Sequence, residues 1–323
     1  MEWQSDILGP GFESRAFEAA GEDGVRRKAT LVRFTPPVTS AVRPAGPRRA
    51  VLFLHGWSDY FFNVELARFW AGQGFEFFAM DMHNHGRSLQ PGTPGGYVAD
   101  LGNYDAEIST AVGMIAESGG PGPVQLALMG HSTGGLVAAL WASRNPGAVS
   151  QLVLNSPWLE MHGSALVRRA AWTMVEPIAR LRPEAVLRLP ERGFYWRSIS
   201  SSAEGEWALD DAYRPPLAFP VRAAWLSAIL AGQAKVARGL GIAVPILVLL
   251  SAASENGMVW NEEMRRTDAV LDVNTIAARA MSLGRTVTVE RIDGALHDVF
   301  LSRADVRADA YGRLARWVRG YAA

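Results

Sequence analysis

The chain has 323 residues, of which 49% are hydrophobic and 20% charged, so it can form one large α/β domain or two ordinary ones with a sizeable core. Its formal net charge is zero and no block of like charge stands out, which argues against a nucleic-acid partner. The absence of cysteine excludes disulfides, thiolate catalysis and cysteine-ligated metals.

The N-terminal segment, residues 1–17, lacks the basic stretch followed by an apolar stretch that marks a signal peptide. The longest apolar run, residues 242–250, contains Pro245 and is too short to span a bilayer. These features predict a cytoplasmic protein without a membrane span, and they leave its oligomeric state open.

Apolar segments and helix-forming segments alternate along most of the chain. Residues 12–35 alternate loosely and are interpreted as two outer antiparallel strands. Short apolar runs predict strands at 50–54, 75–80, 124–129, 151–154 and 245–250, and the alternating residues 286–292 predict a further strand. Helices are expected at 63–73, 105–117, 273–283 and 303–320. Because strands separated by helices imply right-handed crossovers, we predict a mostly parallel, twisted sheet with flanking helices.

The regular alternation stops at Pro157 and resumes at Val244. The intervening segment, residues 158–241, carries five of the eleven tryptophans. We interpret it as an inserted helical cap on an α/β core made of residues 1–157 and 242–323. Within it, five apolar residues recur at near-helical spacing: Leu166, Ala170, Met174, Ile178 and Leu181. Packing of the cap against the body is the favoured interpretation of this stripe, and contact with substrate is the alternative.

Residues 124–143 carry the most informative motif, an apolar run followed by a tight turn and a helix-forming run. The turn from Gly130 to Gly134 reads G-x-S-x-G. The central backbone of so tight a turn is strained, and Cβ atoms two residues to either side would collide. Gly130 and Gly134 have no Cβ atom and so avoid this collision. We therefore predict that Ser132 stands exposed at the helix N-terminus as a nucleophile. An ordinary turn that contains serine would also fit the pentapeptide alone.

A serine hydroxyl is a poor nucleophile at neutral pH, so Ser132 requires a general base. His297 follows the last predicted strand through a short turn, which brings it to the same sheet edge as Ser132. His131 is expected to diverge from Ser132 and to pack inside the turn. The other histidines are His55, His83 and His85, which could orient loops at strand ends by hydrogen bonds, and His162, at the start of the cap.

The oxyanion that forms in acyl transfer needs fixed hydrogen-bond donors. Thr133 N–H, at the N-terminus of the helix after the turn, is one candidate. Trp57 N–H is a second, because Gly56 lets the backbone beyond the strand that ends at Leu54 approach closely. Turns of this kind also occur as simple strand exits.

Four motifs follow one another along the chain: LHGWSDY at 54–60, DMHNHGRS at 81–88, GHSTGG at 130–135 and GALH at 294–297. In this order they resemble the α/β-hydrolase superfamily and, more narrowly, the monoacylglycerol lipase, lysophospholipase and S33-type serine hydrolase group. The resemblance covers the chain from about residue 50 to the end, apart from the cap. It implies a Ser–acid–His triad, an oxyanion hole at Trp57 and Thr133, and a cap over the acyl pocket.

The acid of the triad departs from the pattern of this group, which has an aspartate a few residues after the strand that here ends at residue 250. This sequence has Glu255 there. Asp268 lies later, but the helix and strand between it and His297 resemble the spacing of the group, with 251–267 as an insertion. We favour Asp268 and keep Glu255 as the alternative. Structural roles are expected for Asp272, as a helix N-cap with Thr275 at the third helical position, and for Asp298, which is too close along the chain to orient His297.

These residues predict a serine carboxylester hydrolase that cleaves small to medium apolar acyl esters through an acyl-enzyme, with no metal and no organic cofactor. An acyltransferase or a C–C bond hydrolase could use the same triad. A non-catalytic ligand-binding protein on the same fold is the alternative from another class. Dehalogenases and epoxide hydrolases of the superfamily that this chain resembles have an aspartate at the position of Ser132. The serine therefore argues against both of these activities.

Overall fold

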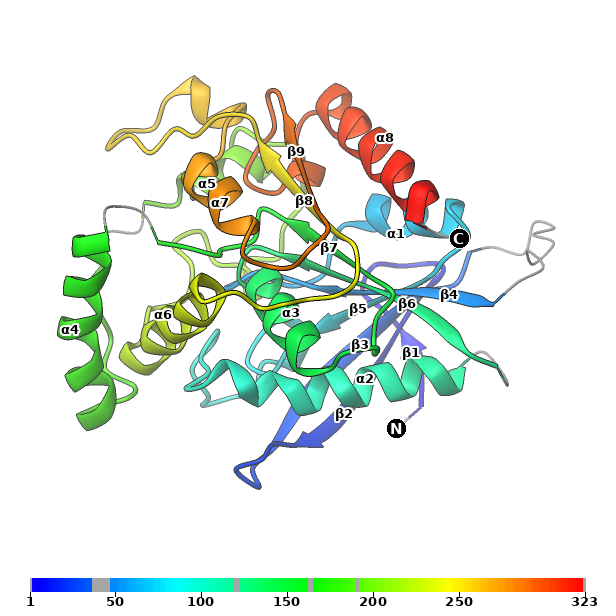
Figure 1. Ribbon diagram of the computed structural model, residues 1–323, viewed down its shortest axis with the longest axis horizontal. Coiled ribbons are helices and arrows are strands. Elements are labelled where there is room, and N and C mark those ends of the chain that lie inside the picture. Colours follow the sequence, from blue (N-terminus) through cyan, green and yellow to red (C-terminus); the bar gives the residue numbers. More distant parts are fainter. Residues whose placement is uncertain (1, 37–46, 119–121, 162–164, 190–191, 322–323) are drawn as a thin grey trace.

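The computed structural model of the protein describes residues 2–36, 47–118, 122–161, 165–189 and 192–321, and within the first half of α4 it describes the backbone only. These residues form a nine-stranded sheet in the order β1-β2-β3-β5-β4-β6-β7-β8-β9 (Figure 1). Its strands are β1 Gln4–Ser5, β2 Phe12–Ala20, β3 Arg26–Phe34, β4 Arg48–Leu54, β5 Glu76–Asp81, β6 Val124–His131, β7 Gln151–Asn155, β8 Ile246–Ser251 and β9 Val287–Ile292.

Strand direction separates the sheet into two parts. β2 and β3 pair antiparallel at one side, as expected for residues 12–35, and β3 pairs antiparallel with β5. From β5 across to β9 every neighbouring pair is parallel. This confirms the prediction of a mostly parallel sheet. The carboxyl ends of β4, β6, β7 and β8 therefore meet at one edge, where residues from distant segments can be brought together.

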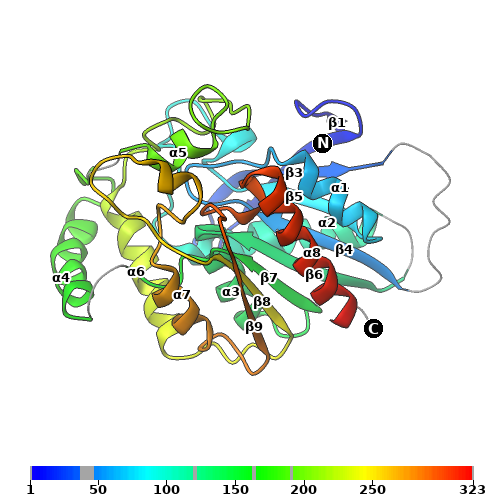
Figure 2. The same ribbon diagram turned by 90° about the horizontal axis from the view of Figure 1, so that it is seen from above.

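Helices cover both faces of the sheet, so that the molecule has three layers (Figure 2). The helices are α1 Val64–Gly72, α2 Asp105–Ser118, α3 Thr133–Arg144, α4 Ala165–Leu181, α5 Phe194–Ile199, α6 Ala223–Ala237, α7 Val273–Ala280 and α8 Ala304–Tyr321. Short 3₁₀ helices lie at Gly86–Ser88, Leu101–Tyr104, Glu262–Arg265 and Val299–Leu301. None of the described helices is long and apolar enough to cross a membrane.

The alternation of side chains along each strand fills two separate apolar cores. Val51 and Phe53 of β4 belong to the core beneath α1 and α8. Leu52 and Leu54 of the same strand belong to the core beneath α2, α3, α6 and α7. Because successive strand residues point to opposite faces, a strand with both faces covered reads as a continuous apolar run. The short apolar runs in the sequence are the direct result.

Between β7 and β8 the chain carries α4, α5 and α6. The interpretation of residues 158–241 as an inserted helical cap remains a prediction. Helix α6 packs on the body, and its Trp225 and Ile229 are 3% and 0% exposed. Helix α4 packs beside α6 at the outer end of the molecule (Figures 1 and 2).

The interpretation of the α4 stripe as cap-to-body packing is wrong where side chains are described. Met174, Ile178 and Leu181 are 72%, 40% and 84% exposed. Val175 is buried instead, and it lies about 100° further around the helix, on the neighbouring face. A helix at the edge has few neighbours, so only a narrow line of its surface is covered. The side chains of Leu166 and Ala170 lie outside the described residues.

Helix α3 begins in close contact with the end of β4. A Cβ atom on Gly134 would lie 2.2 Å from the carbonyl oxygen of His55 and 2.6 Å from that of Leu54. Both contacts are with backbone atoms, which cannot move without displacing the strand. The absence of a side chain at position 134 therefore sets the distance between the first turn of α3 and the sheet edge.

We predict that Gly134→Ala lowers the free energy of unfolding by more than about 2 kcal/mol, because the added methyl group overpacks a rigid contact. The matched control is Gly113→Ala, in the exposed middle of α2, where an added Cβ meets nothing within 4 Å. This control should raise stability by up to about 1 kcal/mol, since alanine favours helix. Urea unfolding of the two variants measures both effects, and equal stabilities would contradict the argument.

Candidate active site

Ser132 occupies the turn between β6 and α3 with φ 52° and ψ −118°, a conformation that is strained for a residue with a side chain. Neighbouring backbone holds it there. Its N–H donates to Asn155 O at 3.0 Å, and its carbonyl oxygen accepts from Gly135, Leu136 and Trp158 N–H groups. A Cβ on Gly130 would lie 2.5 Å from Gly134 O, so the turn closes only around glycine. The tight strand–turn–helix geometry expected from the sequence is confirmed.

His297 and Asp268 are brought together beyond the carboxyl ends of β8 and β9. His297 Nδ1 lies 2.9 Å from Asp268 Oδ2, and the two residues are 2% and 0% exposed. The second carboxylate oxygen, Oδ1, accepts from the N–H groups of Val270 and Leu271 at 2.8 Å each. A carboxylate held by two backbone donors has a fixed orientation, so it can fix the imidazole plane as well.

The long loop after β8 leaves the sheet edge and returns to it. Asp268 N donates to Ala253 O, and Glu255 N donates to Asp268 O, both at 2.9 Å, so residues 253–255 and 268 form a short parallel bridge. Residues 256–267 are the excursion between them. Glu255 Oε1 accepts from Gly257 N within this loop at 2.9 Å. The carboxylate that contacts His297 is therefore Asp268 rather than Glu255.

The loop after β4 passes directly beside Ser132. A Cβ on Gly56 would lie 3.3 Å from Ser132 Cβ. This contact brings the Trp57 N–H and the Thr133 N–H to the same region of the sheet edge. Among the described residues, neither N–H donates to a protein acceptor.

Asn155, at the end of β7, connects the Ser132 turn to the His297 loop and was not singled out from the sequence. Its carbonyl oxygen accepts from Ser132 N and faces His131 Nδ1 at 3.1 Å. Its side chain donates to Asp298 Oδ1 at 2.6 Å and accepts from Val299 N at 3.2 Å. Asp298 thus has a structural role, as expected. The feature of the sequence that could have identified Asn155 is a polar residue at the end of a buried strand.

Three successive residues of the loop after β4 are bonded to the segment between β7 and β8. Ser58 Oγ accepts from Phe219 N at 2.9 Å, and Tyr60 Oη accepts from Asp210 N at 3.0 Å. Asp59 forms an ion pair with Arg214 at 2.5 Å, and both side chains are less than 10% exposed. Burial alone would lower the pKa of Arg214, but the Asp59 carboxylate raises it, so the arginine stays charged.

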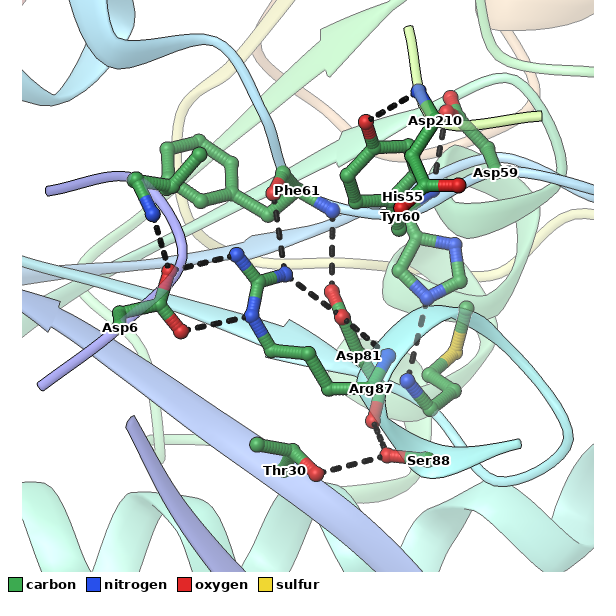
Figure 3. A network of polar contacts seen from close by, with 12 residues as sticks. Asp6, Thr30, His55, Asp59, Tyr60, Phe61, Asp81, Arg87, Ser88 and Asp210 are labelled. Atoms are coloured by element: carbon green, nitrogen blue, oxygen red, sulfur yellow. Dashed lines mark hydrogen bonds and ion pairs between the residues drawn. The ribbon is translucent and has the colours of Figure 1, made fainter. Parts of the chain in front are cut away.

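The same loop is anchored from below by a second buried network (Figure 3). Asp81 Oδ1 accepts from Phe61 N at 2.9 Å, while its Oδ2 pairs with Arg87 at 2.8 Å. Arg87 also donates to Asp6 and to Phe61 O. His55 accepts from the backbone beyond β5. The arginine of the DMHNHGRS motif therefore helps to fix the path of the loop that precedes α1.

The remaining histidines orient loops, as the sequence suggested. His83 pairs with Glu107 and thereby ties the loop after β5 to α2. His85 Nδ1 lies 2.9 Å from His83 O. Asp272 accepts from Asn274 and Thr275 N–H groups, which confirms it as the N-cap of α7. His162 lies outside the described residues.

Comparison with known proteins identifies the family. Residues 45–303 match the model of the family described as serine aminopeptidase, S33. The chain belongs to this family. Its members are hydrolases with the α/β-hydrolase fold, so the predicted resemblance and fold are confirmed.

The individual proteins that the chain resembles have low sequence identity to it. A monoacylglycerol lipase of Mycolicibacterium smegmatis is 28% identical over 153 residues, which are 45% of this chain and 53% of that protein, so the chain spans about half the length of this curated relative. The structure of a soluble variant of monoglyceride lipase from Saccharomyces cerevisiae superposes with a TM-score of 0.64 at 16% identity, covering 95% of this chain and 96% of that one. A thermostable carboxyl esterase of Bacillus coagulans gives 0.63 at 13% identity, covering 97% and 99%. The two structures show likeness of fold.

His131 packs inside the Ser132 turn, 2% exposed, with its ring centroid 4.9 Å from that of His297. Burial lowers the pKa of His131 to about 4, although Asp298 opposes the shift. The unfolded chain, with an ordinary histidine pKa near 6.5, takes up a proton between about pH 6.5 and 4 that the folded protein does not. Stability is therefore lost as pH falls through this window.

We predict that wild type loses up to about 3 kcal/mol more of its free energy of unfolding between pH 7 and pH 4 than His131→Asn does. Asparagine can keep a donor near the position of Nδ1, facing Asn155 O, and does not titrate. Urea unfolding at steps of pH measures the difference. The same pH dependence in both proteins would show that His131 does not carry this linkage.

Proposed function

We propose that the protein is a serine carboxylester hydrolase in which Ser132 is the nucleophile, His297 the general base and Asp268 the acid that orients it. The observation that carries this proposal is the 2.9 Å contact between His297 Nδ1 and a fully buried Asp268 carboxylate, at the sheet edge that also holds the strained Ser132 turn. A histidine whose Nδ1 donates to a fixed carboxylate presents Nε2 as a base.

The reaction follows from these groups. His297 Nε2 takes the proton of Ser132 Oγ as the oxygen attacks the ester carbonyl, and the resulting oxyanion accepts from Trp57 N–H and Thr133 N–H. Collapse of the tetrahedral intermediate breaks the ester bond, and His297 returns the proton to the leaving alkoxide. Water activated by the same histidine then cleaves the acyl-enzyme and restores Ser132.

An apolar acyl group is the substrate that suits the surroundings. Trp57 packs against Trp225 of α6 with tilted rings whose centroids lie 4.4 Å apart, and the ring centroid of Trp158 lies 6.0 Å from that of Trp225. We propose that residues 158–241 act as the cap and that these rings bound a pocket for small to medium acyl chains. A relative described as a monoacylglycerol lipase supports an ester substrate.

We predict that kcat/KM for p-nitrophenyl esters rises from acetate to at least butyrate, since each buried methylene contributes about 0.8 kcal/mol.

Ser132→Ala should lower the turnover of these esters by roughly four to six orders of magnitude and abolish labelling by a fluorophosphonate probe. Its melting temperature should match that of wild type or exceed it. An unlabelled, inactive wild-type protein would favour a non-catalytic ligand-binding role, and a variant with more than a tenth of wild-type turnover would exclude Ser132 as nucleophile.

Asp268→Asn and Glu255→Gln form a matched pair, because each removes one charge from the same loop without changing the shape of the side chain. We predict that Asp268→Asn lowers turnover by roughly four orders of magnitude, since the histidine loses its correct tautomer. Glu255→Gln should cost less than about tenfold. Steady-state rates with p-nitrophenyl butyrate measure both, and the reverse order would assign the acid to Glu255.

A further inference from the structure

His55 is a fully buried residue whose two ring nitrogens have different partners. Nδ1 lies 2.7 Å from the carbonyl oxygen of Gly56, which can only accept a hydrogen bond. Nε2 lies 3.1 Å from Met82 N, which can only donate. The ring is therefore the neutral Nδ1–H tautomer: it donates to Gly56 and accepts from the residue that follows β5.

The bond to Gly56 O fixes the plane of the Gly56–Trp57 peptide. The carbonyl and the following N–H of a trans peptide point in opposite directions, and none of the described peptide bonds is cis. Because the Gly56 carbonyl points toward the His55 ring, the Trp57 N–H of the same peptide points away from that ring. The peptide also lies beside Ser132, since a Cβ on Gly56 would be 3.3 Å from Ser132 Cβ.

We propose that His55 is a positioning residue that aims the Trp57 N–H at the oxygen on which charge develops during acyl transfer. This role rests on the proposed ester hydrolysis. A flexible Gly56–Trp57 peptide could rotate its N–H away from the oxyanion, whereas the His55 bond prevents the rotation before substrate arrives. Losing one fixed oxyanion donor costs about 10²–10³ in kcat. Substrate binding depends on it much less, because the full charge exists only in the transition state.

Other contacts keep the course of this loop without His55. Ser58 Oγ accepts from Phe219 N, and Phe61 N donates to Asp81. On the far side, the Trp57 indole donates to Gly96 O at 3.0 Å. The bond between His55 and Gly56 therefore determines the orientation of one peptide more than the position of the whole loop. A purely structural His55 would instead act through its bond to Met82.

The two ring nitrogens can be replaced separately. In His55→Asn the amide can take the place of Nδ1 and donate to Gly56 O, with the contact to Met82 lost. In His55→Gln the amide can reach the place of Nε2 and accept from Met82 N, with the contact to Gly56 lost. The proposal expects His55→Asn to keep kcat within about tenfold of wild type and His55→Gln to lose about 10²–10³. KM should change by less than about threefold in both.

A trifluoromethyl ketone adds a readout, because its adduct with Ser132 places an oxyanion on the same donors. Its inhibition constant should rise in His55→Gln in proportion to the loss in kcat/KM, and change little in His55→Asn. Melting temperatures distinguish a positioning role of His55 from a structural one. Losses of kcat that parallel losses of thermal stability in the variants would overturn the proposal. Equal kcat in the two variants would also overturn it while leaving ester hydrolysis intact. A wild-type protein that neither cleaves esters nor binds the ketone would overturn the proposed function and this role together.

Discussion

The candidate site depends on one strained turn, in which Ser132 adopts a positive φ of 52° between β6 and α3. Such a conformation costs about 1–3 kcal/mol and persists only where the surroundings over-determine it. Here Asn155 O holds the N–H of Ser132, and a helix packed at Gly134 against the end of β4 closes the turn from the other side. The same contacts bring α3 and the loop after β4 together, so the proposed nucleophile and both proposed oxyanion donors are positioned by one constraint.

The loop after β4 is the second element that this edge requires, and it is held from two directions. From above, Ser58, Asp59 and Tyr60 are bonded to residues 210–219 of the segment between β7 and β8. From below, Arg87 and Asp81 hold Phe61. Buried polar contacts are costly to leave half made, so displacement of the upper segment would expose unpaired groups in the loop. The loop that carries the proposed oxyanion donor Trp57 and the proposed cap are thereby coupled by hydrogen bonds as well as by packing.

The proposed acid, Asp268, is held in place independently of the long loop that precedes it. Residues 256–267 depart from the end of β8 and return, and the bridge between residues 253–255 and 268 closes the excursion at its base. Because Asp268 is fixed at this bridge and by the backbone N–H groups of Val270 and Leu271, the length of the loop before it has little effect on the carboxylate. The histidine contacts a residue that is anchored to the sheet edge, not one on a free loop.

The sequence by itself determined the parallel sheet, the Ser132 turn and the position of His297, because each depends on local order: apolar runs, glycines at fixed spacing and a histidine directly after a strand. It favoured Asp268 without excluding Glu255, since both follow β8 and only the bridge at residues 253–255 decides which carboxylate meets the imidazole. It misplaced the apolar stripe of α4, because periodicity shows which residues share a face but not whether another element covers it. Asn155 bonds to Asp298, which lies 143 positions away along the chain, and Asp59 pairs with Arg214, which lies 155 positions away. Only the folded chain could bring such distant residues together.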